Sequence, residues 1–239
     1  MKDYIGNFWT FILTLILLPP VYGAGKSFFI SLFSLKAAGP GSAEFAYFIL
    51  GIISFIVFQI IFAKPIRTYV FGHELTHALA GIISGAKVKT FTVKKSSGSV
   101  TLSKAGVFIT LAPYFLPVYT VFLMIAYFLF YLVFKSQAIA SYNIFVYLVG
   151  VTLAFHISLT SYAIFQGQTD LRKYGVLFSI LFVLLLNIFV LEGVIAVFFK
   201  ASIGNFLNNS IQYTKDGYFL FYQTGVKIKC LITKTIIRN

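Results

Sequence analysis

Acidic residues are scarce in this chain of 239 residues, which has 6 Asp and Glu against 19 Lys and Arg. Charged residues of both signs make up only 10% of the sequence, whereas a soluble domain usually carries about a quarter. Hydrophobic residues make up 59%, and the mean hydropathy is +0.91. These values exclude an ordinary soluble domain and indicate an integral membrane protein.

Cysteine is nearly absent as well. Cys230 is the only one, so the chain can form neither an intrachain disulfide nor a cysteine-based metal site. The formal net charge of +13 would favour nucleic-acid binding in a soluble protein. Here the basic residues lie in short gaps between apolar runs, so we expect them to meet anionic headgroups of the lipid bilayer and not nucleic acid.

Long apolar runs make up most of the sequence. Each of about six runs can cross roughly 30 Å of hydrocarbon as a helix. The first follows Lys2 and could be a cleaved signal peptide, although the multispanning context favours a retained helix. The predicted fold is therefore an all-α integral membrane protein with about six transmembrane helices. The runs cover residues 5–25, 45–63, 66–86, 107–134, 138–165 and 176–199, and Pro113 and Pro117 predict a kink in the fourth.

Two segments outside these runs carry β-strand patterns. Residues 87–104 alternate apolar and polar side chains around a Ser-Ser-Gly-Ser turn, which predicts a β-hairpin after the third helix. The chain becomes more polar after Lys200. We therefore predict a polytopic membrane domain over residues 1–200 and a small extramembrane tail over 201–239. Residues 217–222 and 226–237 of this tail are β-prone, which predicts a second hairpin or a loose tail.

The third run contains the motif His73-Glu74-Leu75-Thr76-His77. Residues four apart share a face of a helix, so His73 and His77 can bind one zinc ion, and Glu74 can act on its water. A carboxyl group inside an apolar helix is costly, which by itself indicates a functional site. The alternative is that these three polar side chains only satisfy one another in a packed bundle.

A catalytic zinc usually has three protein ligands. Elimination among the acids and the remaining histidine leaves Asp170, His156 and, more weakly, Glu192 as candidates for the third. On a continuous helix His156 and Asp170 would lie about 21 Å apart. Both can bind one ion only if the chain unwinds, for which Gly167 is a suitable place.

These motifs together resemble the site-2 protease family of intramembrane zinc metalloproteases, most closely its short, divergent bacterial branch. The resemblance covers residues 71–187, and it places a metalloprotease core at about 66–199 with the hairpin at 87–104. It implies zinc bound by His73, His77 and Asp170, with Glu74 as the catalytic base, although the Asn-Pro and Asp-Gly context usual for the aspartate is missing. His156 therefore stays the alternative third ligand. The motifs that carry the resemblance are His73 to His77, Gly85, Gly98 in the hairpin, Leu111-Ala112-Pro113-Tyr114 and Gln168-Thr169-Asp170.

The resulting hypothesis is a metalloendopeptidase of the inner (plasma) membrane of a bacterium. It would hydrolyse peptide bonds of transmembrane or membrane-proximal protein substrates, with Glu74 activating the zinc-bound water. An exposed edge of the hairpin could hold an unwound substrate segment by β-augmentation. Two rivals stay open: a catalytically silent membrane scaffold or chaperone of the same fold, and a metal-ion transporter.

Overall fold

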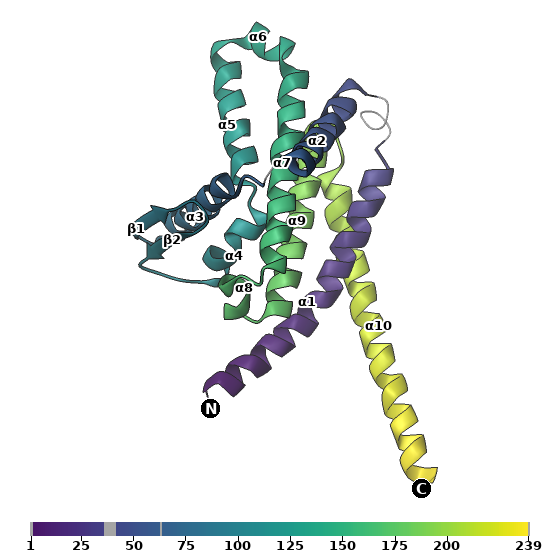
Figure 1. Cartoon of the computed structure of the whole chain (residues 1–239). Helices are drawn as coiled ribbons and strands as arrows, with labels where there is room; N and C mark the ends of the chain where they lie inside the picture. The colour runs from purple at the N-terminus through teal and green to yellow at the C-terminus, as the bar shows by residue number, and fades with distance from the viewer. Residues whose placement is uncertain (1, 36–41, 63, 239) are drawn as a thin grey trace.

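The computed structural model describes residues 2–35, 42–62 and 64–238 of the chain. These residues form a mostly helical molecule with one small β-hairpin (Figure 1). The elements in chain order are α1 (Lys2–Phe33), α2 (Ala43–Ile61), α3 (Ile66–Ile83), β1 (Val88–Val93), β2 (Gly98–Leu102), α4 (Val107–Phe115), α5 (Val118–Val133), α6 (Lys135–Ala140), α7 (Tyr142–Phe165), α8 (Thr169–Lys173), α9 (Val176–Phe199) and α10 (Ile203–Arg238).

Long apolar helices indicate a multi-pass membrane protein. In the described part of the chain, α2, α7, α9 and residues Phe8–Phe33 of α1 are long and apolar enough to cross a membrane. Helices α4 and α5 add a fifth span if they count as one, and they are bent by 73° at a break formed by Leu116 and Pro117, where a kink was predicted. Residue 63, the last of the second predicted run, lies outside the described residues.

Of the about six spans expected, four or five are thus present as candidate spans in the described part of the chain. Helix α3 forms where the third run was predicted, but it does not belong to the helices apolar enough to cross a membrane. The physical reason is its own polar content, since Arg67, Glu74 and the two histidines lie within its 18 residues. The residues that make α3 chemically interesting are the ones that lower its hydropathy.

The predicted hairpin after the third helix is confirmed. Strands β1 and β2 pair antiparallel, with Phe91 opposite Val100 and Val93 opposite Gly98. The turn from α3 into β1 depends on Gly85, whose φ of +72° lies in the left-handed region that glycine adopts without strain. The hairpin packs back against α3. This packing brings Gly98, the first residue of β2, close to Glu74 near the middle of α3.

The predicted C-terminal hairpin is wrong. Residues 217–222 and 226–237 both belong to the single long helix α10. Its first half packs antiparallel along α1, and Figure 1 shows the two helices side by side before their far ends diverge. Phe206, Ser210 and Gly217 recur at helical spacing and are buried. This tertiary contact stabilises the helix over the first half of α10, and the exposed residues from 218 onward continue the same helix.

Three apolar clusters hold the bundle together, and two of them contain most of its buried side chains. One lies where α2, α7 and α9 meet and includes Phe48, Val149 and Phe198. The other joins α3, α4, α8 and α9 and includes Leu111, Tyr114, Leu171 and Val183. The second cluster fixes the position of the short helix α8 relative to α3, and these two helices carry the polar residues described next.

Candidate metal centre

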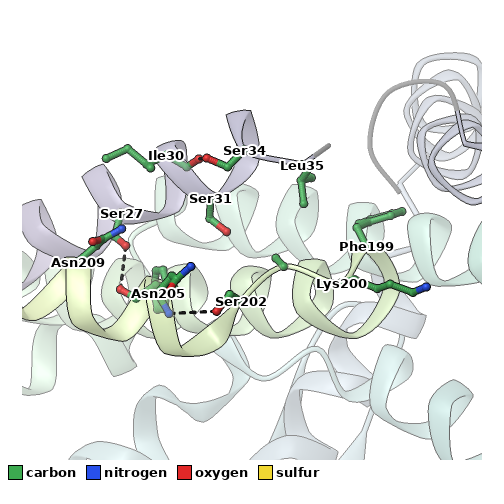
Figure 2. A pocket seen from close by; sticks show the side chains of 12 residues that line it. Ser27, Ile30, Ser31, Ser34, Leu35, Phe199, Lys200, Ser202, Asn205 and Asn209 are labelled. Carbon is green, nitrogen blue, oxygen red and sulfur yellow. Dashed lines mark hydrogen bonds between the residues drawn. The ribbon is translucent and has the colours of Figure 1, made fainter. Parts of the chain in front are cut away.

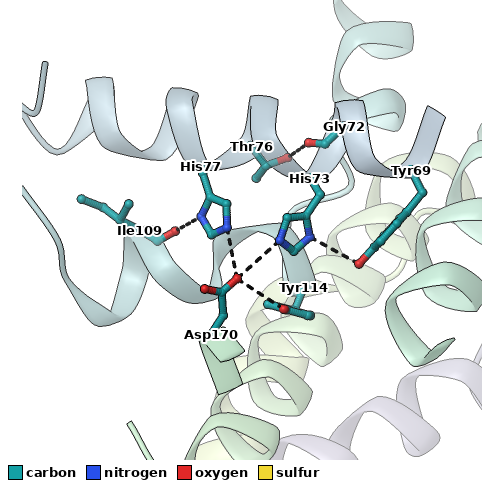
Figure 3. Close-up of polar contacts among 8 residues, drawn as sticks. All are labelled: Tyr69, Gly72, His73, Thr76, His77, Ile109, Tyr114 and Asp170. Atoms are coloured by element: carbon teal, nitrogen blue, oxygen red, sulfur yellow. Dashed lines mark hydrogen bonds and ion pairs between the residues drawn. The ribbon is translucent and has the colours of Figure 1, made fainter. Parts of the chain in front are cut away.

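Helix α3 places His73 and His77 on one face, as their spacing requires. Figure 3 shows both imidazole rings pointing away from α3 toward the carboxylate of Asp170 on α8. The Nε2 atom of His73 lies 3.4 Å from Oδ2 of Asp170, and that of His77 lies 3.2 Å from the same oxygen. Residues 93 positions apart in the sequence thus converge on one point.

Asp170 reaches this point because the chain is interrupted after α7. That helix ends at Phe165, and Gly167 follows with a φ of +66°, which matches the interruption predicted near this glycine. The next residue in the core is Leu171, which is fully buried, and its carbonyl oxygen accepts a hydrogen bond of 3.0 Å from the Ser179 hydroxyl. Leu171 thus anchors α8, and Asp170 beside it lies next to the two histidines.

The three side chains could hold a metal ion. One ligand atom from each of His73, His77 and Asp170 lies within 4.8 Å of the others. Ligands about 2.0–2.1 Å from a tetrahedral zinc lie roughly 3.3 Å from one another, which is close to both nitrogen-to-oxygen distances. Among the described residues no fourth His, Cys, Asp or Glu joins this group. Three protein ligands leave a coordination position for water or substrate.

The hydrogen bond at Nδ1 of His77 favours a cation next to its Nε2. Its Nδ1 donates to the carbonyl oxygen of Ile109 at 2.8 Å, because a carbonyl can only accept. In the neutral ring Nε2 then carries a lone pair, and it faces an oxygen of Asp170, which is also an acceptor. Two acceptors at this distance require a positive species between or on them. A proton on Nε2 supplies this charge, and so does a metal ion bound to both atoms.

His73 has a similar support on its other nitrogen. Its Nδ1 lies 3.3 Å from the hydroxyl of Tyr69, one helical turn earlier on α3. Metal-binding histidines commonly use the second ring nitrogen in this way, which fixes the ring and its tautomer. Both histidines thus present Nε2 to the same point.

Asp170 is held in its charged form. Burial alone would raise the pKa of its carboxyl, but where the rings of His73 and His77 are protonated, their hydrogen bonds and positive charge outweigh that effect and keep the pKa well below its usual value. The Tyr114 hydroxyl also donates to Oδ2 of Asp170, at 3.4 Å. An ionised carboxylate is the form in which Asp ligates a metal.

Glu74 lines the same cavity as the three candidate ligands. This cavity has a volume of about 340 Å³, and Ser99, Gln168 and Lys173 also line it. Strand β2 begins directly over Glu74, because a Cβ at Gly98 would lie only 2.9 Å from Oε1 of that carboxylate. Only glycine allows the hairpin to come this close without displacing Glu74.

No protein-family model, curated protein or solved structure matches this chain. The resemblance to the site-2 protease family thus rests on the motifs themselves, and the case for the site rests on its geometry.

The two other candidate ligands lie elsewhere. His156 on α7 lines a separate cavity of about 20 Å³ with Tyr69 and His73, and it is not in the candidate metal group. Glu192 on α9 lies against Ser31 of α1, which donates a hydrogen bond of 2.7 Å to it. The structure thus groups Asp170, and neither alternative, with the two histidines.

Sequence reasoning missed the residues that orient the ligands. Tyr69 is four residues before His73 and shares its helix face, so the spacing rule used for the histidines could have found it. Tyr114 belongs to a motif that was noticed, but nothing in the sequence pairs it with Asp170. The carbonyl of Ile109 carries no sequence signal, since every residue has one.

Proposed function

We propose that this protein is an intramembrane zinc metalloprotease that hydrolyses peptide bonds within or near the membrane. The observation that carries the proposal is the convergence of His73, His77 and Asp170, with Glu74 lining the same cavity. Two nitrogens and one carboxylate oxygen form a ligand set used by catalytic zinc sites. The proposed membrane is the inner (plasma) membrane of a bacterium, in line with the branch that the motifs resemble.

His73, His77 and Asp170 would hold the zinc ion. Bound there, zinc would supply Lewis-acid chemistry, because it lowers the pKa of water and polarises a carbonyl oxygen. Glu74 accepts the proton of the attacking water at its carboxylate and delivers it to the leaving amine nitrogen. The Ile109 carbonyl and the Tyr69 hydroxyl keep the two imidazoles in the orientation that this chemistry needs.

The hairpin offers a place for the substrate. Residues 98–100 of β2 line the cavity beside Glu74, and the described sheet has two strands, so each strand leaves one edge unpaired. A transmembrane segment hides its carbonyls in helical hydrogen bonds and must be partly extended before cleavage. An extended segment can pair with a free strand edge through its main chain, which gives affinity with little demand on sequence.

The test is cleavage of a reporter transmembrane segment by the full chain in liposomes. Glu74→Gln keeps the size and the hydrogen-bonding ability of the side chain but cannot take up a proton. We expect its rate to fall by about 10²- to 10⁴-fold while zinc content stays at the wild-type level. Asp216→Asn, a carboxylate change on exposed α10, serves as the matched control and should cleave normally.

A zinc-loaded wild type that leaves a panel of transmembrane segments uncut would overturn the peptidase proposal and favour the scaffold. Zinc flux into liposomes that depends on His77 would favour the transporter. Equal cleavage by wild type and Glu74→Gln would remove Glu74 from the chemistry.

A further inference from the structure

Helix α10 packs along a helix that can cross the membrane, although α10 itself is not among the apolar helices of the described chain. The Ser27 hydroxyl of α1 donates to the carbonyl oxygen of Phe206 at 2.8 Å. The Tyr218 hydroxyl of α10 donates to the carbonyl oxygen of Ile16 at 2.7 Å. Both contacts fall inside the apolar stretch of α1, so residues 206–218 of α10 lie at the same depth as that stretch.

The side of α10 that faces α1 has polar partners. A polar cavity of about 330 Å³ opens where α10 begins. Figure 2 shows Ser27 and Ser31 of α1 on one side of this cavity, with Asn205 and Asn209 of α10 opposite. Ser31 in turn donates a hydrogen bond of 2.7 Å to Glu192, which is buried behind it. The polar groups between the two helices therefore lie near one another.

The other side of α10 carries a line of exposed residues at alternating spacings of four and three. Phe206, Ser210 and Gly217, which are buried toward α1, lie on the opposite side of the helix. A line with this spacing is the surface that one helix presents to another when the two pack side by side. We call it the outer stripe, and it consists of Asn208, Gln212, Lys215, Phe219, Tyr222 and Val226.

The first half of the outer stripe is polar at membrane depth. No hydrogen bond joins the amide of Asn208 to another group of the described chain. The amide nitrogen of Gln212 donates to Asp216 on the same helix at 3.2 Å, which leaves its carbonyl oxygen as an acceptor. Lipid tails offer no partner to such groups, whereas side-chain amides hydrogen-bond readily to a second helix. Lys215 has a long stem that can carry its ammonium toward the membrane surface.

A second copy of this chain supplies the partner that these amides lack. A side-chain amide has both a donor and an acceptor, so a stripe of amides is complementary to itself. Two copies inserted in the same direction and related by a two-fold axis along the membrane normal place their α10 helices parallel. Each residue of the stripe then meets its own counterpart. Polar residues at such positions also fix the register of the pair.

We propose that two copies of this chain pair through the outer stripes of their α10 helices, which run parallel. The amides of Asn208 and Gln212 hydrogen-bond between the copies, and Phe219, Tyr222 and Val226 continue the contact with apolar packing. This interface goes beyond the proposed peptidase activity and does not rest on it, since none of its residues belongs to the candidate metal group or lines its cavity.

The test is disulfide cross-linking of the full chain in liposomes. Cys230→Ser removes the only native cysteine, and a single cysteine is then introduced by Phe219→Cys or by Phe221→Cys. Both phenylalanines are exposed, but Phe221 lies on a different face of α10. A disulfide requires Cα atoms within about 7 Å, which a parallel pair provides only along the stripe, so Phe219→Cys should cross-link at least about tenfold faster.

A second measurement removes the amides. Energy transfer between labelled copies, followed as the liposomes are diluted with lipid, gives the dissociation constant of the dimer. Asn208→Leu combined with Gln212→Leu should raise this constant about tenfold, the scale of two hydrogen bonds between membrane helices. Gln137→Leu combined with Gln166→Leu is the matched control, because it removes two exposed amides outside α10. It should pair as tightly as the wild type.

A wild type that stays monomeric at every dilution would overturn the proposal. Cross-linking of Phe221→Cys as fast as that of Phe219→Cys would do the same, and so would undiminished pairing of a folded Asn208→Leu/Gln212→Leu variant. If that variant does not fold, as judged by thermal unfolding, the two cysteine variants still decide, because they retain both amides.

Discussion

The candidate metal centre and the cavity between α1 and α10 are both polar regions of a largely apolar protein, yet they are built differently. At the metal centre each ligand residue has a second partner: the Ile109 carbonyl for His77, the Tyr69 hydroxyl for His73 and the Tyr114 hydroxyl for Asp170. At the other cavity the wall residue Ser31 donates to the buried Glu192, whose second oxygen has no hydrogen-bond partner in the described chain. The first region brings three ligand atoms together that could hold a metal ion, and in the second region the hydroxyls and amides that line the cavity do not converge on one point.

The difference teaches that burial of polar groups has two uses in one chain. Ligand atoms that converge within a few ångströms specify position, so they depend on a rigid surrounding network. Polar groups that only line a cavity or lie buried behind it do not require such precise placement. Substitutions should therefore affect the two regions independently, and the following measurements test that independence from the largest expected effect to the smallest.

The substitution His77→Ala should break the metal centre alone. We expect zinc affinity to fall by more than about a hundredfold. Even the loss of a residue that only hydrogen-bonds to a metal ligand lowers metal affinity by about 10- to 100-fold. Zinc content of the purified protein by mass spectrometry measures the effect. His156→Ala is the matched control and should retain zinc, because His156 lies outside the ligand group. Zinc loss in the control, or its retention in His77→Ala, would contradict the assignment of the ligands.

The substitution Gly98→Ala tests how the hairpin meets Glu74. The added methyl would collide with the Glu74 side chain, so either the strand or the carboxylate must move. If Glu74 is the catalytic base, a displacement of this kind should slow cleavage by about a hundredfold. Zinc content should not change. Gly106→Ala is the control, because a Cβ at that glycine meets no atom within 4 Å, and it should cleave at the wild-type rate.

The second region can be broken through Gly23. Its added Cβ would lie 2.6 Å from the carbonyl oxygen of Ser210, so Gly23→Ala should force α1 and α10 apart. We expect a loss of about 1–3 kcal/mol in the free energy of unfolding, measured by denaturation in detergent. Zinc content should match the wild type. A Cβ at Gly225, in the exposed part of α10, meets nothing within 4 Å, so Gly225→Ala should be neutral or slightly stabilising.

The smallest effect concerns a single supporting hydroxyl. Tyr69→Phe removes the partner of His73 Nδ1 and leaves the ring in place. Zinc affinity, measured by competition with a chelator, should fall by about tenfold. This is the lower limit of the effect usual for a residue that hydrogen-bonds to a metal ligand. Tyr131→Phe on α5, outside the cavity of the metal centre, should leave the affinity unchanged. An unchanged affinity in Tyr69→Phe would show that the network is not needed to hold the ion.

The sequence by itself determined the membrane character, the position of most helices, the hairpin after α3 and the pairing of His73 with His77. These features follow from hydropathy, from turn residues and from the 3.6-residue period of an α-helix. Each of these signals can be recognised within a short stretch of sequence. The C-terminal helix was missed because its conformation depends on α1, which lies almost two hundred residues away in the chain.

Only the tertiary structure decided which residue completes the metal group. His156, Asp170 and Glu192 were alternatives that spacing alone could not separate. The break at Gly167 and the burial of Leu171 bring Asp170 to the histidines, while Glu192 faces α1 and His156 lines another cavity. The physical reason is that a ligand set requires distances of a few ångströms between residues far apart in the chain, and packing of several helices sets those distances.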